Sequence, residues 1–142
     1  MTAFDIDATG MKAELTHLNV ISMNLANVKT TRTADGTPYR RKSVLYAATP
    51  VDTPFSTAMK TELDRELRGV KVQGVVSDNR PLKRVYDPAH PDSDKQGYVS
   101  YPDINVVEEM ANMITAQRTF DANVASVNTI KGMYSTALEL GK

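Results

Sequence analysis

Several acidic and turn-forming residues near the middle of the chain have the spacing of a calcium-binding loop. The positions one, three, five, six and twelve of a loop of the EF-hand type are filled by Asp92, Asp94, Gln96, Gly97 and Asp103. Such a loop needs a helix leading into it, which Pro88 and Pro91 disfavour. Asp103 is also shorter than the glutamate that usually binds calcium at the last position. Two interpretations therefore stay open, a calcium-binding module at residues 92–103 and a solvated polar turn.

Catalytic groups of other kinds are difficult to assemble from this sequence. His90 lies beside Asp87 and Asp92, but His17, the other histidine, belongs to a different segment. The chain has no cysteine, which excludes disulfides, thiolate zinc sites and a thiol nucleophile. We also find no serine in a nucleophile elbow and no glycine-rich phosphate-binding motif. The sequence therefore predicts a protein that is not an enzyme and carries no cofactor and, unless residues 92–103 bind calcium, no metal.

The composition is that of a single-domain globular protein. The chain has 142 residues, of which 41% are hydrophobic and 24% are charged. Its 17 basic and 17 acidic residues balance, so no net charge attracts nucleic acid or an anionic membrane. No apolar run approaches the length of about 18 residues that a membrane span needs, and the N-terminus lacks the basic start of a signal peptide. We expect no nucleic-acid binding and no membrane insertion, and composition alone indicates a cytoplasmic location.

A long amphipathic helix is predicted for residues 105–141. Its apolar positions recur at alternating steps of four and three and form one seam: Val106, Met110, Met113, Phe120, Val124, Val127, Tyr134 and Leu138. Asn105 suits the N-cap, Glu108 and Glu109 suit the positive end of the helix dipole, and Gly141 marks the end. At about 1.5 Å per residue this helix is roughly 50 Å long, so it needs a partner helix or a partner molecule.

A second helical pattern covers residues 3–27. Its apolar positions follow the same rhythm: Phe4, Met11, Leu15, Leu18 and Leu25. Because both seams repeat at about 3.5 residues, the period of a left-handed supercoil, we expect the two helices to pair as a coiled coil. Asn19, Asn24 and Asn27 lower the helix propensity of this segment. Either they form a solvated face, or they make polar contacts that set the register of the helices.

The region between the helices, residues 28–104, is expected to form a small β part. A basic loop at 28–45 leads into a short strand at 42–46, and residues 48–60 are expected to be a connector of little fixed structure. A β-hairpin is predicted from the alternating pattern of residues 69–76 and the return at 82–86. Tyr98–Tyr101 is predicted as a further short strand. The predicted fold is thus mainly α with a small β part, with residues 1–27 and 105–142 forming one coiled-coil domain.

Motifs near both ends of the chain resemble those of the bacterial flagellar axial proteins. The run at 19–27, which ends in Asn-Leu-Ala-Asn, and the Thr-Thr-Arg-Thr at 30–33 are similar to their N-terminal signature. Residues 105–110, with Met113-Ile114, Gln117-Arg118 and Ala122-Asn123, resemble the matching C-terminal signature. The blocks at 38–42, 86–91 and 97–102 narrow the resemblance to the basal-body rod family and its proximal-rod subunits of the FlgC type. The sequence departs from the family pattern at two places. Phe120 stands where the family more often has tyrosine, and Asp103-Ile104 stands where it often has Asn-Val.

The resemblance implies a structural role. Members of this family are subunits of the rod, the drive shaft that crosses the periplasm and transmits motor torque, and they are not enzymes. Their terminal helices pack together and against neighbouring subunits in a helical tube. They are exported from the cytoplasm, unfolded or partly unfolded, through the flagellar type III export apparatus without a cleaved signal peptide, so the resemblance overrides the cytoplasmic location. The implied partners are other copies, other rod subunits and the export apparatus. A coiled-coil adaptor or secreted interaction protein, which would form closed dimers, is the remaining alternative beside the calcium-binding module.

Two groups of residues are expected to make contacts in such an assembly. The subunit interface is predicted to contain residues of both terminal helices: Leu15, Leu18, Asn24, Leu25, Asn27, Val106, Met110, Met113, Gln117, Phe120, Asn123, Val124 and Val127. Gln117 occupies a seam position that an apolar residue would otherwise fill, and polar residues there specify register. The second group is a predicted electrostatic contact of basic Arg40, Arg41 and Lys42 with acidic Glu108 and Glu109. This contact would lie within one subunit or between neighbours, and a solvated basic loop is the alternative.

Overall fold

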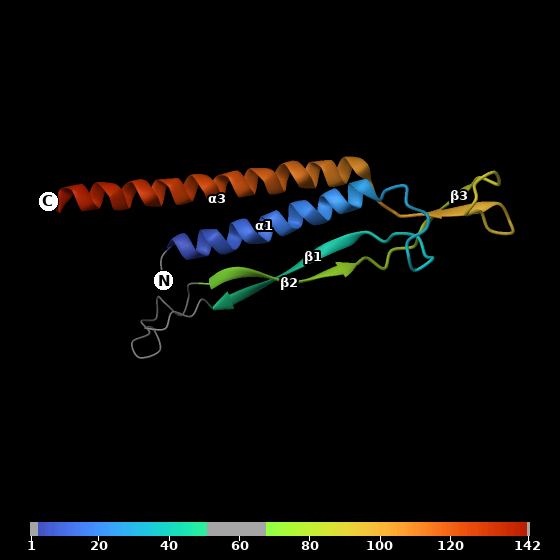
Figure 1. The fold of residues 1–142 in the computed structure, drawn as a ribbon, viewed down its shortest axis with the longest axis horizontal. Coiled ribbons are helices and arrows are strands. Elements are labelled where there is room, and N and C mark those ends of the chain that lie inside the picture. Colours follow the sequence, from blue (N-terminus) through green and yellow to red (C-terminus); the bar gives the residue numbers. More distant parts are fainter. Residues whose placement is uncertain (1–2, 51–67, 142) are drawn as a thin grey trace.

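The computed structural model describes residues 3–50 and 68–141, which form an elongated molecule of two long helices and two small sheets (Figure 1). Helix α1 spans Ala3–Ala26 and helix α3 spans Val106–Leu140. The strands between them are β1 Lys42–Pro50, β2 Arg68–Ser77, β3 Lys83–Tyr86 and β4 Tyr98–Tyr101. The predicted fold, mainly α with a small β part, is therefore confirmed. Within the described residues, neither helix is long and apolar enough to cross a membrane.

Helix α1 is the middle layer of the molecule. Helix α3 runs along one side of α1 in the opposite direction, and the β1–β2 sheet lies along the other side (Figure 1). The sheet is tied to α1 by a hydrogen bond of 3.1 Å from the Val70 N–H to the Thr9 hydroxyl, and by an edge-on contact of His17 with Tyr46. The β3–β4 sheet lies apart from these layers, beyond the end where α1 stops and α3 starts (Figure 1). Helix α1 therefore carries the contacts of both neighbouring layers.

Contacts at three levels define how the two helices are aligned. Ser126 donates a hydrogen bond of 2.6 Å to Asp7, and Asn24 donates one of 3.2 Å to Glu109. Between these two levels the Asn123 side chain lies so close to Gly10 that a Cβ atom added to the glycine would be 3.1 Å from it. The two residue numbers total 133 in every pair, so the antiparallel alignment is unbroken. The same alignment places Ala3 beside Ile130. Residues 131–140 of α3 therefore extend about 15 Å beyond α1, as Figure 1 shows at the C-terminal end.

The packed faces of the helices differ from the predicted seams. The buried residues of the helix pair are mostly small or polar: Ala13, Val20, Ile21, Asn24, Glu109 and Ala116. Leu15 and Met110, both placed in the seams, are 52% and 54% exposed. The physical reason is that small residues such as Gly10, Ala13 and Ala116 fill part of the packed face, so Leu15 and Met110 are not needed there and stand outside. Met113, Phe120, Val124 and Val127 are half-buried, whereas Val106, Tyr134 and Leu138 are exposed. The predicted pairing is thus confirmed, and the predicted seams are right only in part.

The strand pairing also corrects the sequence-based prediction. β1 pairs with β2 and β3 pairs with β4, both antiparallel, so the hairpin predicted between residues 69–76 and 82–86 is wrong. Ten-residue β2 matches nine-residue β1 along its whole length, with a bulge between Leu45 and Tyr46, whereas β3 has only four residues. β1 also continues to Pro50, where a connector was expected. The rest of that connector, residues 51–60, lies outside the described residues.

The ends of α3 match the sequence signals for helix termini. The Asn105 side chain accepts hydrogen bonds from the N–H groups of Val107 and Glu108, at 3.1 and 3.5 Å. Two of the amide groups that a helix start leaves without internal partners are satisfied in this way. Gly141 is the C-cap, with a φ of −92°, so it ends the helix without using the left-handed conformation. The helix therefore begins and ends at the predicted residues.

Candidate functional site

A buried polar cluster joins the end of α1, the start of β1 and the first turns of α3. Asn24 is its centre and is only 1% exposed. Its amide nitrogen donates to the Lys42 carbonyl at 2.9 Å and to Glu109 Oε2 at 3.2 Å. Its amide oxygen accepts from the Lys42 N–H at 2.9 Å and from the Tyr39 hydroxyl at 3.1 Å. Of the two interpretations of the asparagines, Asn24 therefore fits a contact that sets the register of the helices.

Glu109 is neutralised within this cluster by Arg41. The Nε and Nη2 atoms of Arg41 both lie 2.7 Å from Glu109 Oε1, and Arg41 Nη1 donates to the Ser43 hydroxyl at 2.8 Å. The Arg41 side chain is 18% exposed, so water screens this pair much less than an ordinary surface pair. Burial, and after it the Glu109 carboxylate, raises the pKa of Tyr39. In the described part of the chain every buried side-chain nitrogen and oxygen has a partner. The cluster thus connects α1, β1 and α3 through hydrogen bonds and one ion pair, and none of its buried polar atoms lacks a partner.

The other residues of the expected electrostatic contact face different groups. Arg40 donates to the backbone carbonyls of Asp78 and Arg80, at 3.5 and 3.3 Å. The Lys42 ammonium lies 5.8 Å from the centre of the Tyr39 ring. Glu108 is exposed in the first turn of α3. The structure therefore brings Arg41 and Glu109 together within one chain, and any contact of this loop with a neighbouring copy stays a prediction.

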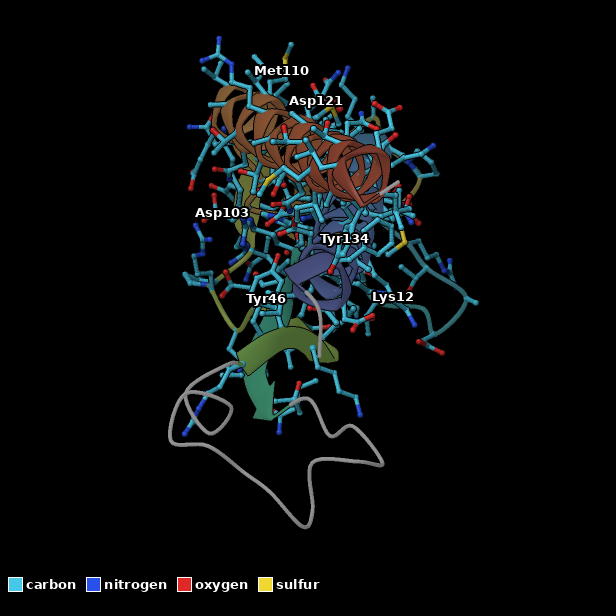
Figure 2. All side chains as sticks on the ribbon, turned by 90° about the vertical axis from the view of Figure 1, so that its left-hand side faces the viewer. Lys12, Tyr46, Asp103, Met110, Asp121 and Tyr134 are labelled. Carbon is cyan, nitrogen blue, oxygen red and sulfur yellow. The ribbon has the colours of Figure 1, made fainter. Side chains whose placement is uncertain are left out.

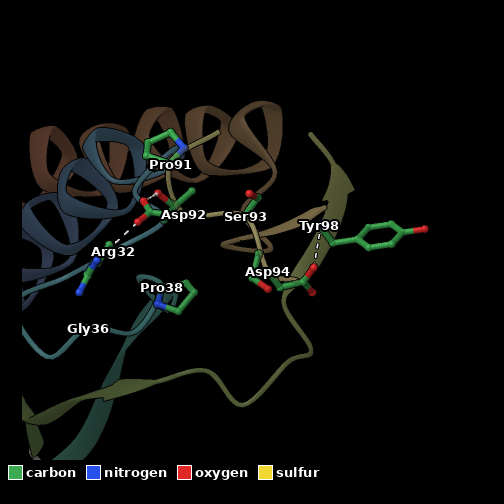
Figure 3. A pocket seen from close by; sticks show the side chains of 10 residues that line it. Arg32, Gly36, Pro38, Pro91, Asp92, Ser93, Asp94 and Tyr98 are labelled. Carbon is green, nitrogen blue, oxygen red and sulfur yellow. Dashed lines mark hydrogen bonds and ion pairs between the residues drawn. The ribbon is translucent and has the colours of Figure 1, made fainter. Parts of the chain in front are cut away.

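The carboxylates of Asp92 and Asp94 already have partners. They border an open polar cleft of about 390 Å³, which lies beside the loop that carries Arg32 (Figure 3). Asp92 accepts from the Thr31 hydroxyl at 2.8 Å and lies 3.8 Å from the Arg32 guanidinium. Asp94 accepts from the N–H groups of Tyr98 and Gln96, and it also pairs with Arg84. The backbone bond from Tyr98 is the main cause that lowers the pKa of Asp94.

No group of three or more histidine, aspartate and glutamate side chains in residues 3–50 and 68–141 is arranged to hold a metal ion. His90 is used locally, since its Nδ1 accepts from the Asp92 N–H at 3.1 Å. Gly97, at the glycine position of the supposed calcium loop, has a φ of +81° and lies against the Tyr86 ring. The spacing that resembled an EF-hand therefore belongs to a turn in which Asp94 bonds to backbone amides of the turn and Asp92 bonds to the loop at Thr31 and Arg32.

Large apolar side chains are exposed on both helices. On α1 the exposed ones are Phe4, Leu15 and Met23, and on α3 they are Val106, Val107, Met110, Ile114, Met133, Tyr134, Leu138 and Leu140. Leu140 is 83% exposed. Figure 2 shows that Met110 lies on the side of α3 that points away from α1. Monomeric proteins rarely expose apolar patches larger than a few hundred Å², and larger ones indicate a surface for a partner. These outer faces, rather than a cleft, are the best candidate functional site.

Known proteins related to this chain fit this interpretation. A family model described as the C-terminal part of the flagellar basal body rod proteins FlgEFG matches residues 95–140. The flagellar basal-body rod protein FlgC of Borreliella burgdorferi is 42% identical, over 98% of this chain and 95% of its own length. FlgC of Bacillus subtilis is 35% identical over the whole of both chains, and FlgC of Salmonella typhimurium is 37% identical over 100% of this chain and 98% of its own. The chain belongs to the FlgC family of flagellar basal-body rod proteins.

Membership of the FlgC family confirms the resemblance seen in the terminal and middle motifs. Of the interface residues expected from that resemblance, Leu15, Val106, Met110 and Gln117 are exposed on this FlgC-type chain. The others lie half-buried in the chain's own packing: Leu18, Leu25, Asn27, Met113, Phe120, Asn123, Val124 and Val127. Asn24 differs from both groups, because its own chain encloses it and satisfies its amide.

The structure adds residues that the sequence analysis missed. Met23, Val107 and Ile114 are exposed apolar side chains of the long helices, but they fall beside the seam positions and were left out for that reason. Tyr39 was seen only as part of a motif, and nothing in the local pattern pointed to its bond with Asn24. Apolar residues that lie one position from a seam are the sequence signal that could have identified Met23, Val107 and Ile114.

Proposed function

We propose that this chain is a structural subunit of the proximal rod of the flagellar basal body, which polymerises through the outer faces of α1 and α3 and transmits motor torque. The observation that carries the proposal is the similarity to FlgC proteins along the whole chain, at 35–42% identity. The exposed apolar side chains of both helices support it, because a subunit of an open polymer needs adhesive surfaces that its own fold leaves uncovered.

The proposed contact surface is centred on the exposed members of the predicted interface. These are Leu15 on α1 and Val106, Met110 and Gln117 on α3, joined by Met23 and Ile114. Contacts that repeat head to tail without closing generate a filament, and two different surfaces on one chain are suited to this. Arg40 and Lys42, whose charges are not neutralised by Glu109, are proposed to face acidic groups such as Glu108 on a neighbouring copy.

The proposal also covers location and partners. The chain would lie in the part of the basal body that spans the periplasm, with further copies and other rod subunits as neighbours. It would reach that place through the flagellar type III export apparatus, without a cleaved signal peptide, and would catalyse no reaction. The helix pair from residues 1–27 and 105–142 would carry polymerisation, and residues 28–104 would form a separate region that braces it.

The decisive experiment removes the gene and examines basal bodies by electron microscopy together with motility in soft agar. Cells without the gene should be non-motile and should have basal bodies that lack a complete rod. Wild-type protein should restore both features, whereas Met110→Ser should restore them poorly, because it changes an exposed apolar contact and no buried one. Thr115→Ser, an exposed change on the same helix that keeps its hydroxyl, is the matched control. Complete rods in cells without the gene would refute the proposal.

A further inference from the structure

The β3–β4 ribbon has one edge that the chain closes and one that it leaves open. On the closed edge the Asp94 N–H donates to the Tyr98 carbonyl at 2.8 Å, and the Asp94 carboxylate accepts from the Tyr98 N–H at 2.9 Å. The backbone groups of Tyr98 therefore point away from β3, so those of Tyr86, which lies directly opposite, point away from β4. The backbone groups of Arg84, two positions along, point the same way. Among residues 3–50 and 68–141, these outward groups of β3 have no hydrogen-bond partner.

The open edge belongs to a strand that is exposed at every position. Val85 is 39% exposed and Tyr86 is 64% exposed. In the described residues the ribbon has two strands and lies apart from the helices, beyond the end where α1 stops (Figure 1). A sheet of two strands is marginally stable in water, and a further strand along its edge stabilises it. Because lysine and arginine on an edge discourage unspecific pairing, Lys83 and Arg84 select a strand whose charges complement them.

We propose that the open edge of β3 pairs with the same edge of a second copy of this chain, antiparallel and centred on Val85. In this register Lys83 lies opposite Asp87 of the second copy, so opposite charges face each other on both sides of the centre. Arg84 lies opposite Tyr86 of the second copy, which sets a cation beside an aromatic ring. The charges that disfavour other strands therefore favour this one.

The same register satisfies the outward backbone groups of β3. Arg84 of each copy and Tyr86 of the other exchange both of their backbone hydrogen bonds, whereas the two Val85 residues form a pair without hydrogen bonds. In a pair of that kind the Cα atoms lie about 4.5 Å apart. Leu82 would lie opposite Pro88 of the second copy, which has no N–H to donate, so the ladder ends there. The pairing is therefore short and has a defined register.

A two-fold contact of this kind cannot repeat, because it uses the open edge of both copies. It is therefore not one of the head-to-tail contacts proposed for the rod, and it would join free subunits by their ribbon ends before they are incorporated. The inference goes beyond the proposed function and does not depend on it. A ladder of four residues from each copy buries much less than the roughly 1,200 Å² of a stable interface, so the dimer is weak and has to be trapped.

Disulfide trapping measures this contact, because the chain contains no cysteine and Cα atoms about 4.5 Å apart suit a disulfide. Full-length Val85→Cys protein is oxidised briefly, and the products are separated on a non-reducing gel. We expect the disulfide-linked dimer to form at least several-fold faster than with the matched control Val75→Cys, which replaces a valine of similar exposure on β2. Equal rates for the two variants would overturn the inference. So would the absence of a Val85→Cys dimer while circular dichroism shows the protein folded.

Charge reversal in the Val85→Cys protein tests the register. Lys83→Glu and Asp87→Lys should each slow the trapping of their own dimers several-fold, because like charges then lie opposite each other on both sides of the centre. The two variants are also mixed, with a tag on one of them that separates the products on the gel. The mixed dimer should form about as fast as the dimer of Val85→Cys alone, because every facing pair again has opposite charges. A mixed dimer that forms no faster than the two homodimers would refute the register and, with it, the inference.

Discussion

Removing one partner of the Arg41–Glu109 pair should destabilise the folded chain more than removing both. The change Arg41→Met leaves the Glu109 carboxylate, which is 1% exposed, with the Asn24 amide as its remaining bond. Breaking a buried pair from one side costs about 3–5 kcal/mol, because the other charge stays buried without compensation. The pair is bonded at 2.7 Å and shielded from water, so we expect Arg41→Met to cost about 4 kcal/mol.

The opposite single change should cost somewhat less. In Glu109→Leu the Arg41 guanidinium keeps its bond to Ser43 and can reach water, since its side chain is 18% exposed. We expect about 3 kcal/mol, the lower end of the range for a broken buried pair. In the double variant Arg41→Met/Glu109→Leu no charge is left buried, and the main loss is one acceptor for the Asn24 amide, worth about 1–3 kcal/mol. The sum of the single costs should therefore exceed the double by several kcal/mol.

Urea unfolding followed by circular dichroism at pH 7 measures these differences, provided that the four proteins have similar m-values. The exposed pair of Arg84 and Asp94 is the matched control, because both side chains are about half exposed. Arg84→Met should change the free energy of unfolding much less than either change at the buried pair. Additive single costs, within about 0.5 kcal/mol of the double variant, would contradict the reasoning. So would a cost for Arg41→Met no larger than that of Arg84→Met.

Other predictions follow from glycine, cap and tyrosine geometry. Gly97→Ala should lower the thermal unfolding midpoint more than Gly36→Ala. Both glycines have a positive φ, but only at Gly97 would the added Cβ atom lie 2.9 Å from the Tyr86 ring, so equal losses would contradict this. Asn105→Ala should cost about 1 kcal/mol by urea unfolding, while Asn105→Ser keeps an acceptor and should cost little. Because the folded-state pKa of Tyr39 is raised, the free energy of unfolding should fall as pH rises above 10.0. In thermal melts taken from pH 9 to 11, Tyr39→Phe should reduce this dependence on pH, and an unchanged dependence would show that another group causes it.

Local signals predicted the helix boundaries well because their causes are local. Asn105 caps α3 through its own side chain and two amides within three residues, so the four residues 105–108 contain the whole interaction. Tyr98–Tyr101 likewise carries a strand pattern that ends at Pro102, and the structure forms β4 there. Such features depend on neighbours along the chain, which a single sequence displays.

Strand partners were predicted poorly because the choice depends on distant segments. β2 could pair with β3, which follows it closely, or with β1, which lies across residues 51–67. The nine-residue ladder with β1 offers more hydrogen bonds and also places the sheet against α1. Sequence spacing favoured the nearer partner, and only the lengths of the two strands argued for the farther one. The bond of Asn24 to Glu109 was not predicted for the same reason, since the two residues lie 85 positions apart, although the contact of Arg41 with Glu109 was expected.

The helix seams show a limit of hydrophobic patterns. A hydrophobic pattern gives most weight to large side chains, and here the large ones, such as Leu15 and Met110, lie outside. The contact within the chain uses Gly10, Ala13 and Ala116 instead, which allow close approach but contribute little to a hydrophobic pattern. An apolar stripe shows that a helix will be covered, but it does not show whether the cover comes from the same chain. On this chain the exposed stripe of large side chains is the surface that the proposed polymerisation would use, and the stripe of small residues is the one that the fold packs.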